Sequence, residues 1–366
     1  MAKSIAAPTR YYQGSLLLSN FYRYVSHIGR NFVIISDKRM RTLVEDRISE
    51  GFENSGSQCS YIDFGGECCN EEIEKLSELT MERNANGVIG VGGGKAIDTA
   101  KMVGDICGLP VVTAPTSAST EASCTCFSSI YSKEGKFQKI LRLKNGPDVV
   151  LVDTDIISKA PSHLFVSGIG NAFSTYYESR SCERSGVQNY FGCTRTHSTM
   201  TLAKLCWDLL LKNGAHAKAD VEAKKVTRAV ETVVEANIYL SGMSYVNNGC
   251  AASQGIYAGL TSITAPSDFF YGEGNAYGLL VQLIMEYTEA NKWAYGEWDQ
   301  VIDFYKSVEL PLKLSDLGIT NADETIIGQI AKTACVSHSS IHNMPFEVNE
   351  KKVCNAIEQL ENMSFL

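Results

Sequence analysis

The feature that most constrains the fold is an alternation of short apolar runs with helix-like segments in the N-terminal part of the chain. Several of the runs are apolar throughout, as expected of parallel strands that helices cover on both faces. Segments 70–84 and 95–106, which lie between runs, have helical spacing. This βαβ alternation predicts an α/β domain with a doubly wound parallel sheet. The strand candidates are residues 32–36, 61–64, 88–91, 110–114 and 149–152.

The strand signal fades after Pro161, and helical patterns replace it. The segment 221–240 carries valines on one helical stripe, with Asp220 as its predicted N-cap. We therefore predict two domains, residues 1–160 with the sheet and an all-helical domain over 161–366, with the active site in the cleft between them. Other segments that favour helix are residues 202–211, 275–287 and 325–334.

Composition and charge exclude several classes of function. The net charge of −8, without runs of Lys or Arg, argues against nucleic acid or an anionic membrane as a partner. The apolar runs are far shorter than the ~20 residues that a membrane-spanning helix needs, and residues 1–10 have no apolar signal core. Twelve cysteines occur without paired spacing, which is typical of free thiols in a reducing compartment. We therefore expect a cytoplasmic protein whose partner is a small-molecule substrate.

A glycine-rich turn joins one predicted strand to the helix that follows it. Residues 87–98 read Gly-Val-Ile-Gly-Val-Gly-Gly-Gly-Lys-Ala-Ile-Asp, so three consecutive glycines precede the helix. Glycine lets the backbone approach a ligand closely, and a helix start offers unpaired N–H groups and the positive end of the helix dipole. The spacing is neither G-x-G-x-x-G nor Walker A. The turn is therefore either a plain strand–helix connection or an anion site suited to a pyrophosphate.

Two further elements favour a nucleotide ligand. Residues 114–121, Ala-Pro-Thr-Ser-Ala-Ser-Thr-Glu, follow a predicted strand and are rich in hydroxyl groups that can bond to a ligand. Asp37 follows the strand 32–36, where a carboxylate can accept both hydroxyls of an adenosine ribose and repel a 2′-phosphate. The alternative for Asp37 is a helix cap. Because Lys38 and Arg39 come next, the sequence favours NAD(H) without excluding NADP(H).

Together these segments resemble the glycerol dehydrogenase branch of the iron-containing alcohol dehydrogenase superfamily. Family-like segments also occur at residues 128–131, 147–153, 166–178 and 341–346, so the resemblance covers nearly the whole chain. It implies a Rossmann-like N-terminal domain, a helical C-terminal domain, a nicotinamide cofactor and association into a homo-oligomer. Position 121, which is Asp in the family and lies near the substrate, is Glu121 here. The residues that the resemblance places along the cofactor are Asp37, Gly93, Gly94, Lys95, Asp98, Thr116, Ser119, Thr125, Phe127 and Tyr131.

The metal ligands of the family are absent from the matching positions. The family binds a divalent metal through the Asp of Gly-x-Gly-Asp-Ala, the first His of His-Ala-Ile-His-Asn-Gly and the His of Tyr-His-Gly-Glu. This chain has Asn171, Gln254 and Tyr271 there, and no histidine between residues 217 and 337. Zinc prefers thiolate, imidazole and carboxylate ligands, so we expect neither zinc nor iron. The acidic and thiol groups nearby in sequence are Cys250, Asp268 and Glu273.

Two classes of function remain. In the first, the chain is a metal-independent oxidoreductase in which Tyr271 donates a proton to a carbonyl oxygen as hydride arrives, oriented by Asn171 and Gln254. A variant is reduction of an imine or iminium, whose positive charge Glu121 and Glu273 would stabilise. In the second, the chain is a nucleotide-binding pseudoenzyme that has lost catalysis. We favour the oxidoreductase because the nucleotide-binding elements are intact.

Other polar residues of the family-like segments receive structural interpretations. Glu178 and Arg180 follow Asn171 in the same predicted helix, and we interpret them as a solvated helix face rather than as catalytic groups. His338 and His342 belong to the family-like tail, and we interpret both as structural.

Overall fold

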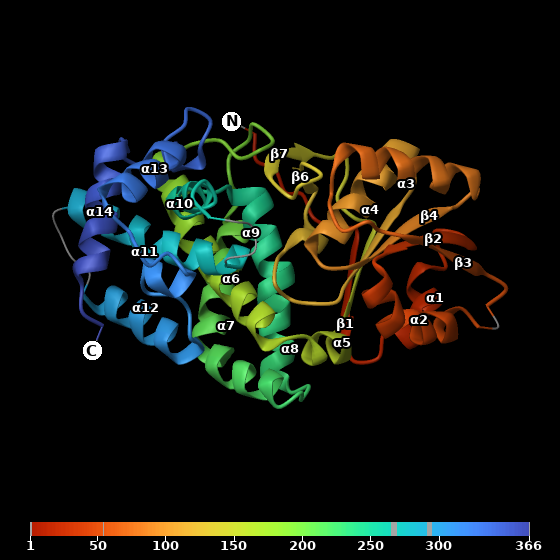
Figure 1. Ribbon diagram of the computed structural model, residues 1–366. Helices are drawn as coiled ribbons and strands as arrows, with labels where there is room; N and C mark the ends of the chain where they lie inside the picture. Colours follow the sequence, from red (N-terminus) through yellow and green to blue (C-terminus); the bar gives the residue numbers. More distant parts are fainter. Residues whose placement is uncertain (1, 54, 265–268, 291–294, 366) are drawn as a thin grey trace. The chain divides into compact units, whose positions relative to one another are not determined.

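The computed structural model describes residues 2–53, 55–264, 269–290 and 295–365 (Figure 1). It divides into two compact units, which we describe separately. The sheet unit consists of Ala6–Phe165 together with Asp220–Gly242. The helical unit consists of the segment that ends at Ile5 and the described parts of Val166–Ala219 and Met243–Leu366. This division differs from the single predicted boundary between residues 160 and 161, because the segment 220–242 returns to the sheet unit.

Six parallel strands form the centre of the sheet unit, in the spatial order β1-β8-β5-β4-β2-β3. The central register pairs Val88 with Val111 and Phe32 with Gly87. The prediction of a doubly wound parallel sheet is therefore confirmed. The strands are β1 (Arg10–Gly14), β2 (Asn31–Ser36), β3 (Gln58–Asp63), β4 (Gly87–Gly92), β5 (Val111–Pro115) and β8 (Val149–Asp153).

Helices cover both faces of this sheet, which explains why its central strands are largely apolar. Phe32 and Ile34 of β2 pack in a core with residues of α1 and α2, whereas Val33 and Ile35 pack in a second core with residues of α3 and α4. Figure 1 shows α3 and α4 on one side of the sheet and α1 and α2 on the other. Alternate side chains of one strand thus enter different cores. The helices are α1 (Phe21–Val25), α2 (Lys38–Phe52), α3 (Asn70–Glu82) and α4 (Gly94–Cys107).

The sheet unit also contains strands that the sequence patterns did not predict. β1 joins the sheet edge through parallel pairing with β8, although its residues are only partly buried. The hairpin of β6 (Phe127–Tyr131) and β7 (Phe137–Arg142) forms a separate antiparallel sheet. β7 is almost wholly exposed, so its sequence lacks the apolar run by which the other strands were recognised.

The returning segment 220–242 is not the single helix predicted for 221–240. Helix α7 (His197–Glu222) ends first, and Thr227 then caps α8 (Arg228–Glu235) by accepting the Val230 N–H. Asp220 does not cap a helix here, because its carboxylate accepts the Thr227 hydroxyl at 2.6 Å. A π-helical turn, η3 (Ala236–Leu240), follows α8. Glu231 fixes α8 to the sheet unit through the Thr154 hydroxyl at 2.7 Å and the Gln13 amide at 3.0 Å.

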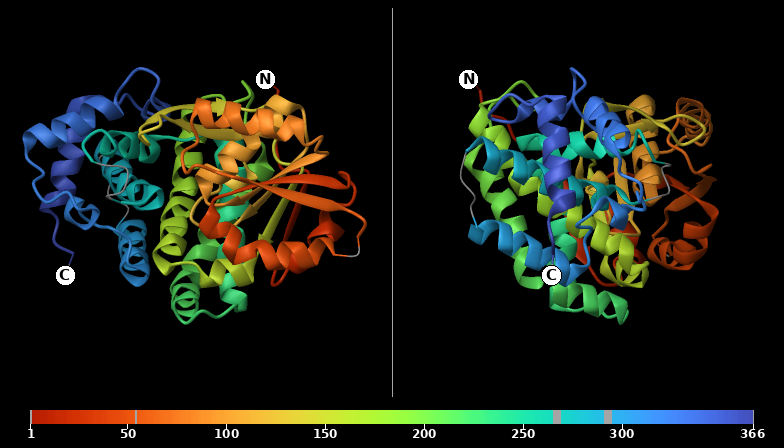
Figure 2. Two further views of the ribbon diagram at one scale, coloured as in Figure 1. Left: turned by 45° about the vertical axis from the view of Figure 1, so that its right-hand side comes forward. Right: turned by 60° about the vertical axis from the view of Figure 1, so that its left-hand side comes forward.

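The helical unit is built from helices and their connections (Figure 2). The predicted helices at 202–211, 275–287 and 325–334 are confirmed as parts of α7, α11 and α13. Glu286 of α11 receives the guanidinium of Arg180 at 2.8 Å and the hydroxyl of Ser181 at 2.7 Å, which joins α11 to α6. The elements are α6 (Ser162–Ser185) and α7, which both begin or end in the sheet unit, then α9 (Ser241–Asn248), α10 (Ala252–Leu260), α11 (Tyr271–Glu289), α12 (Tyr295–Val308), η4 (Leu314–Leu317), α13 (Glu324–Ala334), η5 (Ser340–Asn343) and α14 (Glu350–Asn362).

Two general features agree with the composition. Within the described ranges, none of the helices combines the length and apolar character that crossing a membrane would require. Burial raises the pKa of several thiols, that of Cys68 to about 12, so these cysteines remain protonated near neutral pH.

Candidate functional site

The glycine turn leaves open space where α4 begins. Gly92 has a φ of +148°, a conformation that residues with a side chain rarely adopt. A Cβ added to Gly93 would meet nothing within 4 Å. The helix α4 is 14 residues long, and no side chain caps its N-terminus in the described structure. The turn therefore presents backbone N–H groups and a helix dipole to open space, which is the arrangement that binds phosphate groups.

The strand order places this turn at the switch point of the sheet. From β2 the chain moves outward to β3, then crosses back to β4 on the other side of β2 and continues through β5. Ligands of open α/β sheets bind beyond the carboxyl ends of the strands where the order reverses. Asp37 follows β2 and the glycines follow β4, so both lie at that edge. Topology thus brings together two elements that the sequence analysis had linked to a nucleotide.

Asp37 is a helix cap, and only one of its two carboxylate oxygens makes the capping bond. Its Oδ1 atom accepts the Met40 N–H at 2.9 Å at the start of α2. Among its neighbours, the Lys38 ammonium lies 4.0 Å and the Arg41 guanidinium 3.8 Å from the carboxylate of Asp63. Arg41 also bonds Glu45 at 2.8 Å. Two of the cations near Asp37, Lys38 and Arg41, are therefore paired with carboxylates.

Lys95 and Tyr131 meet at the first turn of α4. The Lys95 ammonium lies 2.6 Å from the carboxylate of Glu67 and 4.8 Å from the centre of the Tyr131 ring. The Tyr131 N–H donates to the Cys68 carbonyl at 2.9 Å. These contacts tie the β6–β7 hairpin and the loop after β3 to the start of α4. The Lys95 ammonium, next to the glycine turn in sequence, is therefore paired with the Glu67 carboxylate.

Asp98 lies beneath the turn rather than at its surface. It is 6% exposed, and its carboxylate accepts the Ser129 N–H at 2.9 Å and lies 2.9 Å from the Lys101 ammonium. Burial raises the pKa of Asp98, against the opposing effect of Lys101. The Lys101 ammonium, itself 1% exposed, also donates to the carbonyls of Ala122, at 2.7 Å, and Phe127. In this structure Asp98 holds β6 against α4.

The hydroxyl-rich loop follows β5 and is bonded to the glycine turn. The Thr116 N–H donates to the Gly92 carbonyl at 3.0 Å, and the Ser117 and Ser119 hydroxyls are 3.0 Å apart. Thr125 and Phe127 are buried where the chain turns into β6, with the Thr125 hydroxyl 3.3 Å from the Phe127 carbonyl. The 3-10 turn η2 (Ala122–Cys124) connects the two parts. Glu121, which precedes η2, is 6% exposed.

Within the helical unit, Asn171, Gln254 and Tyr271, which the resemblance places at metal-ligand positions, take part in two hydrogen-bonded pairs. The Tyr271 hydroxyl donates to Gln254 Oε1 at 2.9 Å, which joins the start of α11 to the first turn of α10. Asn171 lies on α6, and its Oδ1 accepts the side-chain amide of Asn275 at 2.9 Å. Tyr257 lies with its ring edge against Tyr271, the ring centres 4.9 Å apart. The amide oxygens of Asn171 and Gln254 thus already accept hydrogen bonds from protein donors.

No group of three or more His, Cys, Asp or Glu side chains that could hold a metal ion occurs among the residues described. Glu273 accepts the Phe270 N–H at 2.7 Å and so caps α11. Cys250 is buried, and Asp268 lies outside the described residues. Burial raises the pKa of the nearby Tyr257 to about 12, so its phenol is protonated near neutral pH.

Glu178 is buried and the Arg180 side chain is only 14% exposed, so their interpretation as a solvated helix face was wrong. Glu178 is 3% exposed, and its Oε1 accepts the backbone N–H groups of Ala251 and Gln254, each at 3.0 Å. The carboxylate thereby accepts hydrogen bonds from N–H groups at the N-terminus of α10 that have no partner within the helix. It also fixes Gln254, the residue that bonds Tyr271. The Arg180 guanidinium is paired with the carboxylates of Glu286 and Glu297. A single charged residue on a helix carries no signal of burial when its partners lie far away in sequence.

Replacing Glu178 by Ala should destabilise the helical unit. The change leaves the buried Ala251 N–H and the partly buried Gln254 N–H without this acceptor, and a buried donor left unsatisfied costs about 1–3 kcal/mol. Glu178→Gln retains an oxygen acceptor but loses the charge, so we expect a smaller loss. Thermal unfolding of both variants measures the difference. Equal melting temperatures for Glu178→Ala and the unmodified protein would contradict the assigned role.

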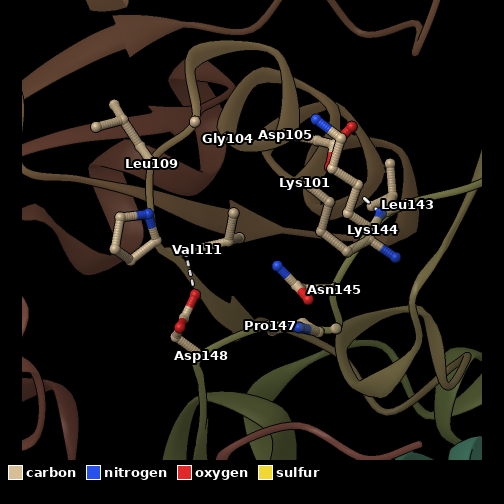
Figure 3. Close-up of a pocket in the computed structure, with 13 residues that line it drawn as sticks. Lys101, Gly104, Asp105, Leu109, Val111, Leu143, Lys144, Asn145, Pro147 and Asp148 are labelled. Carbon is tan, nitrogen blue, oxygen red and sulfur yellow. Dashed lines mark hydrogen bonds between the residues drawn. The ribbon is translucent and has the colours of Figure 1, made fainter.

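A hollow of about 290 Å³ in the sheet unit lies at the opposite edge of the sheet (Figure 3). Its lining includes Pro110, Val111 and Asp148, at the amino ends of β5 and β8. The Asp148 carboxylate accepts the Val111 N–H at 2.9 Å, and Asn145 lies between it and Lys144. Ligands of doubly wound sheets bind at the carboxyl ends of the strands. This hollow is therefore separate from the glycine turn.

A doubly wound sheet with a glycine-rich turn at its switch point is typical of a Rossmann-like protein, here joined to a helical unit. A model of the family described as "Iron-containing alcohol dehydrogenase" matches residues 8–154. The chain is 36% identical to glycerol dehydrogenase of Pseudomonas putida, over 98% of this chain and 96% of that one. It is 38% identical to glycerol dehydrogenase of Thermotoga maritima, over 96% and 94% of the two chains. The chain therefore belongs to the iron-containing alcohol dehydrogenase family.

A solved structure extends this likeness to three dimensions. The crystal structure of a probable glycerol dehydrogenase from Sinorhizobium meliloti matches with a TM-score of 0.91 and 36% identity, over 98% of both chains. The predicted resemblance to the glycerol dehydrogenase branch is thereby confirmed.

Proposed function

We propose that this protein is a nicotinamide-dependent oxidoreductase that interconverts a small carbonyl compound and its alcohol without a catalytic metal. The observation that carries the proposal is the Tyr271–Gln254 pair, in which a phenol O–H is held at 2.9 Å from an amide oxygen. These residues occupy positions where the resemblance places metal ligands. A proton donor thus stands where relatives would place a Lewis acid.

The donor set at these positions does not fit a zinc or iron ion. Asn171 and Gln254 offer neutral amide oxygens, and each oxygen accepts a hydrogen bond from a protein donor. A divalent metal would have to displace these bonds and would gain only weak ligands, since zinc prefers imidazole, thiolate and carboxylate. A phenol with an ordinary pKa near ~10 would also have to lose its proton to bind the metal. We therefore derive no catalytic step through a metal.

The sheet unit fits a dinucleotide. The turn at Gly93 and Gly94 would hold the pyrophosphate, because a Cβ at Gly93 meets nothing within 4 Å and the helix N-terminus is uncapped by side chains in the described structure. Asp37 would accept the adenosine ribose hydroxyls through the oxygen that does not cap α2. When bound, NAD(H) supplies or accepts the hydride. The resemblance to glycerol dehydrogenases supports the same assignment.

Side chains of this protein then have to transfer the proton that accompanies the hydride. Tyr271 donates its phenol proton to the carbonyl oxygen, or takes up the alcohol proton in the reverse direction. Gln254 fixes the direction of the Tyr271 hydroxyl, and Glu178 fixes Gln254 through its backbone N–H. We favour a carbonyl over an iminium substrate because Glu273 is engaged in capping α11. A carboxylate that is already bonded to the backbone stabilises a substrate cation less.

The decisive experiment is NADH oxidation by the purified protein in excess chelator, with aldehydes, ketones and cyclic imines as substrates. If the proposal is correct, the protein turns over a carbonyl compound at the same rate with and without chelator. The protein used should contain less than about one metal ion per ten chains. Preference for an imine would replace the carbonyl assignment. Turnover that chelator abolishes and zinc restores would refute metal independence. NADH binding without turnover of any compound would favour the pseudoenzyme.

Replacing Asp37 by Ser should change the cofactor preference without loss of stability. Ser caps helices about as well as Asp, so the bond to the Met40 N–H can be kept while the negative charge is removed. We expect the ratio of kcat/KM for NADH to that for NADPH to fall by about tenfold, which is 1.4 kcal/mol. Asp37→Ala should also lose the cap, at about 1 kcal/mol. An unchanged ratio in both variants would contradict the role of Asp37.

A further inference from the structure

The returning segment 220–242 contains a π-helical turn that packs against the hydroxyl-rich loop. The Ser241 N–H donates to the Ala236 carbonyl, five residues earlier, so the turn is wider than an α-helical one. Such insertions in α-helices are rare and occur frequently at functional sites. The turn η3 lies directly after α8, which Glu231 fixes to the sheet unit. Its Asn237 is 0% exposed.

The side chain of Asn237 holds the loop through a backbone carbonyl of the loop. Its side-chain amide donates to the Ala118 carbonyl at 3.0 Å and to the Phe165 carbonyl at 3.2 Å. Ala118 lies between Thr116 and Ser119, the two loop residues that the resemblance places along the cofactor. Residues 118 and 237 are 119 positions apart, so the contact is tertiary. The amide therefore fixes the middle of the loop 116–121 to the first residues of α6.

Gly242 meets the same loop at a second point. A Cβ at this position would lie 2.9 Å from the Cβ of Cys124 and 3.4 Å from the Cβ of Glu121. The first distance is shorter than real contacts between such atoms, so any side chain here would push the loop away. The close approach places the end of the segment against Glu121, the residue expected near the substrate.

Other contacts support the loop on both sides of Ala118, beginning with the bond from the Thr116 N–H to the Gly92 carbonyl at 3.0 Å. The Lys101 ammonium holds the Ala122 carbonyl at 2.7 Å, and the Thr113 hydroxyl donates to the Ser123 carbonyl at 2.9 Å. The contacts of Lys101 and Thr113 fix η2, which follows the loop. We propose that Asn237 and Gly242 are positioning residues, through which the π-helical turn sets the loop 116–121 for NAD(H) binding and sets Glu121 for the substrate. This inference rests on the proposed function.

The test compares Asn237→Ala with Ser241→Ala in the full-length protein. The Ser241 hydroxyl donates to the Asn237 carbonyl at 2.7 Å and is equally buried, but its bond stays within the turn. Both variants lose a buried hydrogen-bonding side chain, so both should melt at a lower temperature than the unmodified protein. Only Asn237→Ala should raise the Kd for NADH, measured by fluorescence titration, by about tenfold or 1.4 kcal/mol. Asn237→Ser, which retains one donor, replaces Asn237→Ala if the latter does not fold.

Gly242→Ala tests the second contact independently. It should raise the KM for the carbonyl substrate by about tenfold while changing the Kd for NADH less than Asn237→Ala does. An unchanged Kd in Asn237→Ala, or an equal rise in Ser241→Ala, would overturn the inference for Asn237. An unchanged KM in Gly242→Ala would overturn it for Gly242. If the unmodified protein binds no NADH, the proposed function fails, and this inference fails with it.

Discussion

Replacing Tyr271 by Phe is expected to lower kcat for carbonyl reduction by about 10²–10⁴-fold, the usual contribution of a positioned proton donor. The phenylalanine ring can keep the edge contact with Tyr257, at 4.9 Å between ring centres, and loses only the hydroxyl that bonds Gln254. Binding of NADH should be unaffected, since the groups assigned to the cofactor belong to the sheet unit. The measurement is steady-state turnover at saturating NADH in excess chelator, together with the Kd for NADH.

Tyr305 supplies a matched control for the loss of a tyrosine hydroxyl. Its hydroxyl donates to the Ala276 carbonyl of α11 at 2.9 Å, and its side chain is 0% exposed. Tyr305→Phe should therefore cost stability, about 1 kcal/mol for one hydrogen bond, with little effect on kcat. If Tyr271→Phe and Tyr305→Phe both retain normal kcat, Tyr271 is a pocket-filling aromatic and not the proton donor.

The sheet could be predicted from the sequence because its strands are buried on both faces. Residues 32–35 and 88–91 carry no polar side chain, and each run lies within a strand whose alternate side chains enter two separate cores. β7 is exposed along almost its whole length, so burial left no pattern in its sequence. The break between α7 and α8 was missed for a different reason. The valines of α8 continue the apolar stripe, while Thr227, which restarts the helix, resembles an ordinary helical residue.

The candidate site was predictable where backbone conformation restricts the residue type. Glycine is required where φ is +148° at Gly92, and its position between a strand and a helix is visible in the sequence. The buried polar partners were not predictable in this way. Asn275 bonds Asn171 across 104 positions of sequence, and Glu178 bonds the Gln254 N–H across 76. Asp98 and Lys101 are the exception, because three positions along a helix place two side chains side by side.

Replacing Lys101 by Met is expected to destabilise the sheet unit by about 3–5 kcal/mol, the cost of breaking a buried ion pair by removing one partner. Met fills much of the volume of the Lys side chain but leaves the Asp98 carboxylate, 6% exposed, without its cation. The carbonyls of Ala122 and Phe127 also lose the ammonium as a donor. The free energy of unfolding, from urea denaturation followed by circular dichroism, measures the loss. A loss of unfolding free energy below about 1 kcal/mol would show that the Asp98–Lys101 pair is not a main support of the sheet unit.

The loss should depend on pH with a definite sign. Burial raises the folded-state pKa of Asp98 above its unfolded value of about 3.9, and removal of Lys101 raises it further, because the ammonium opposes that shift. A raised folded pKa means that the contribution of Asp98 to stability is complete below the unfolded pKa and is lost as pH rises through the folded one. The deficit of Lys101→Met should therefore be largest near neutral pH and shrink as the pH approaches 4 or so. Asp98→Asn combined with Lys101→Met has no carboxylate to titrate at position 98, so its deficit should not grow as the pH rises toward neutral. If the deficits of the single and double variants followed the same pH curve, the stability of the Lys101 variant would not be governed by the charge of Asp98.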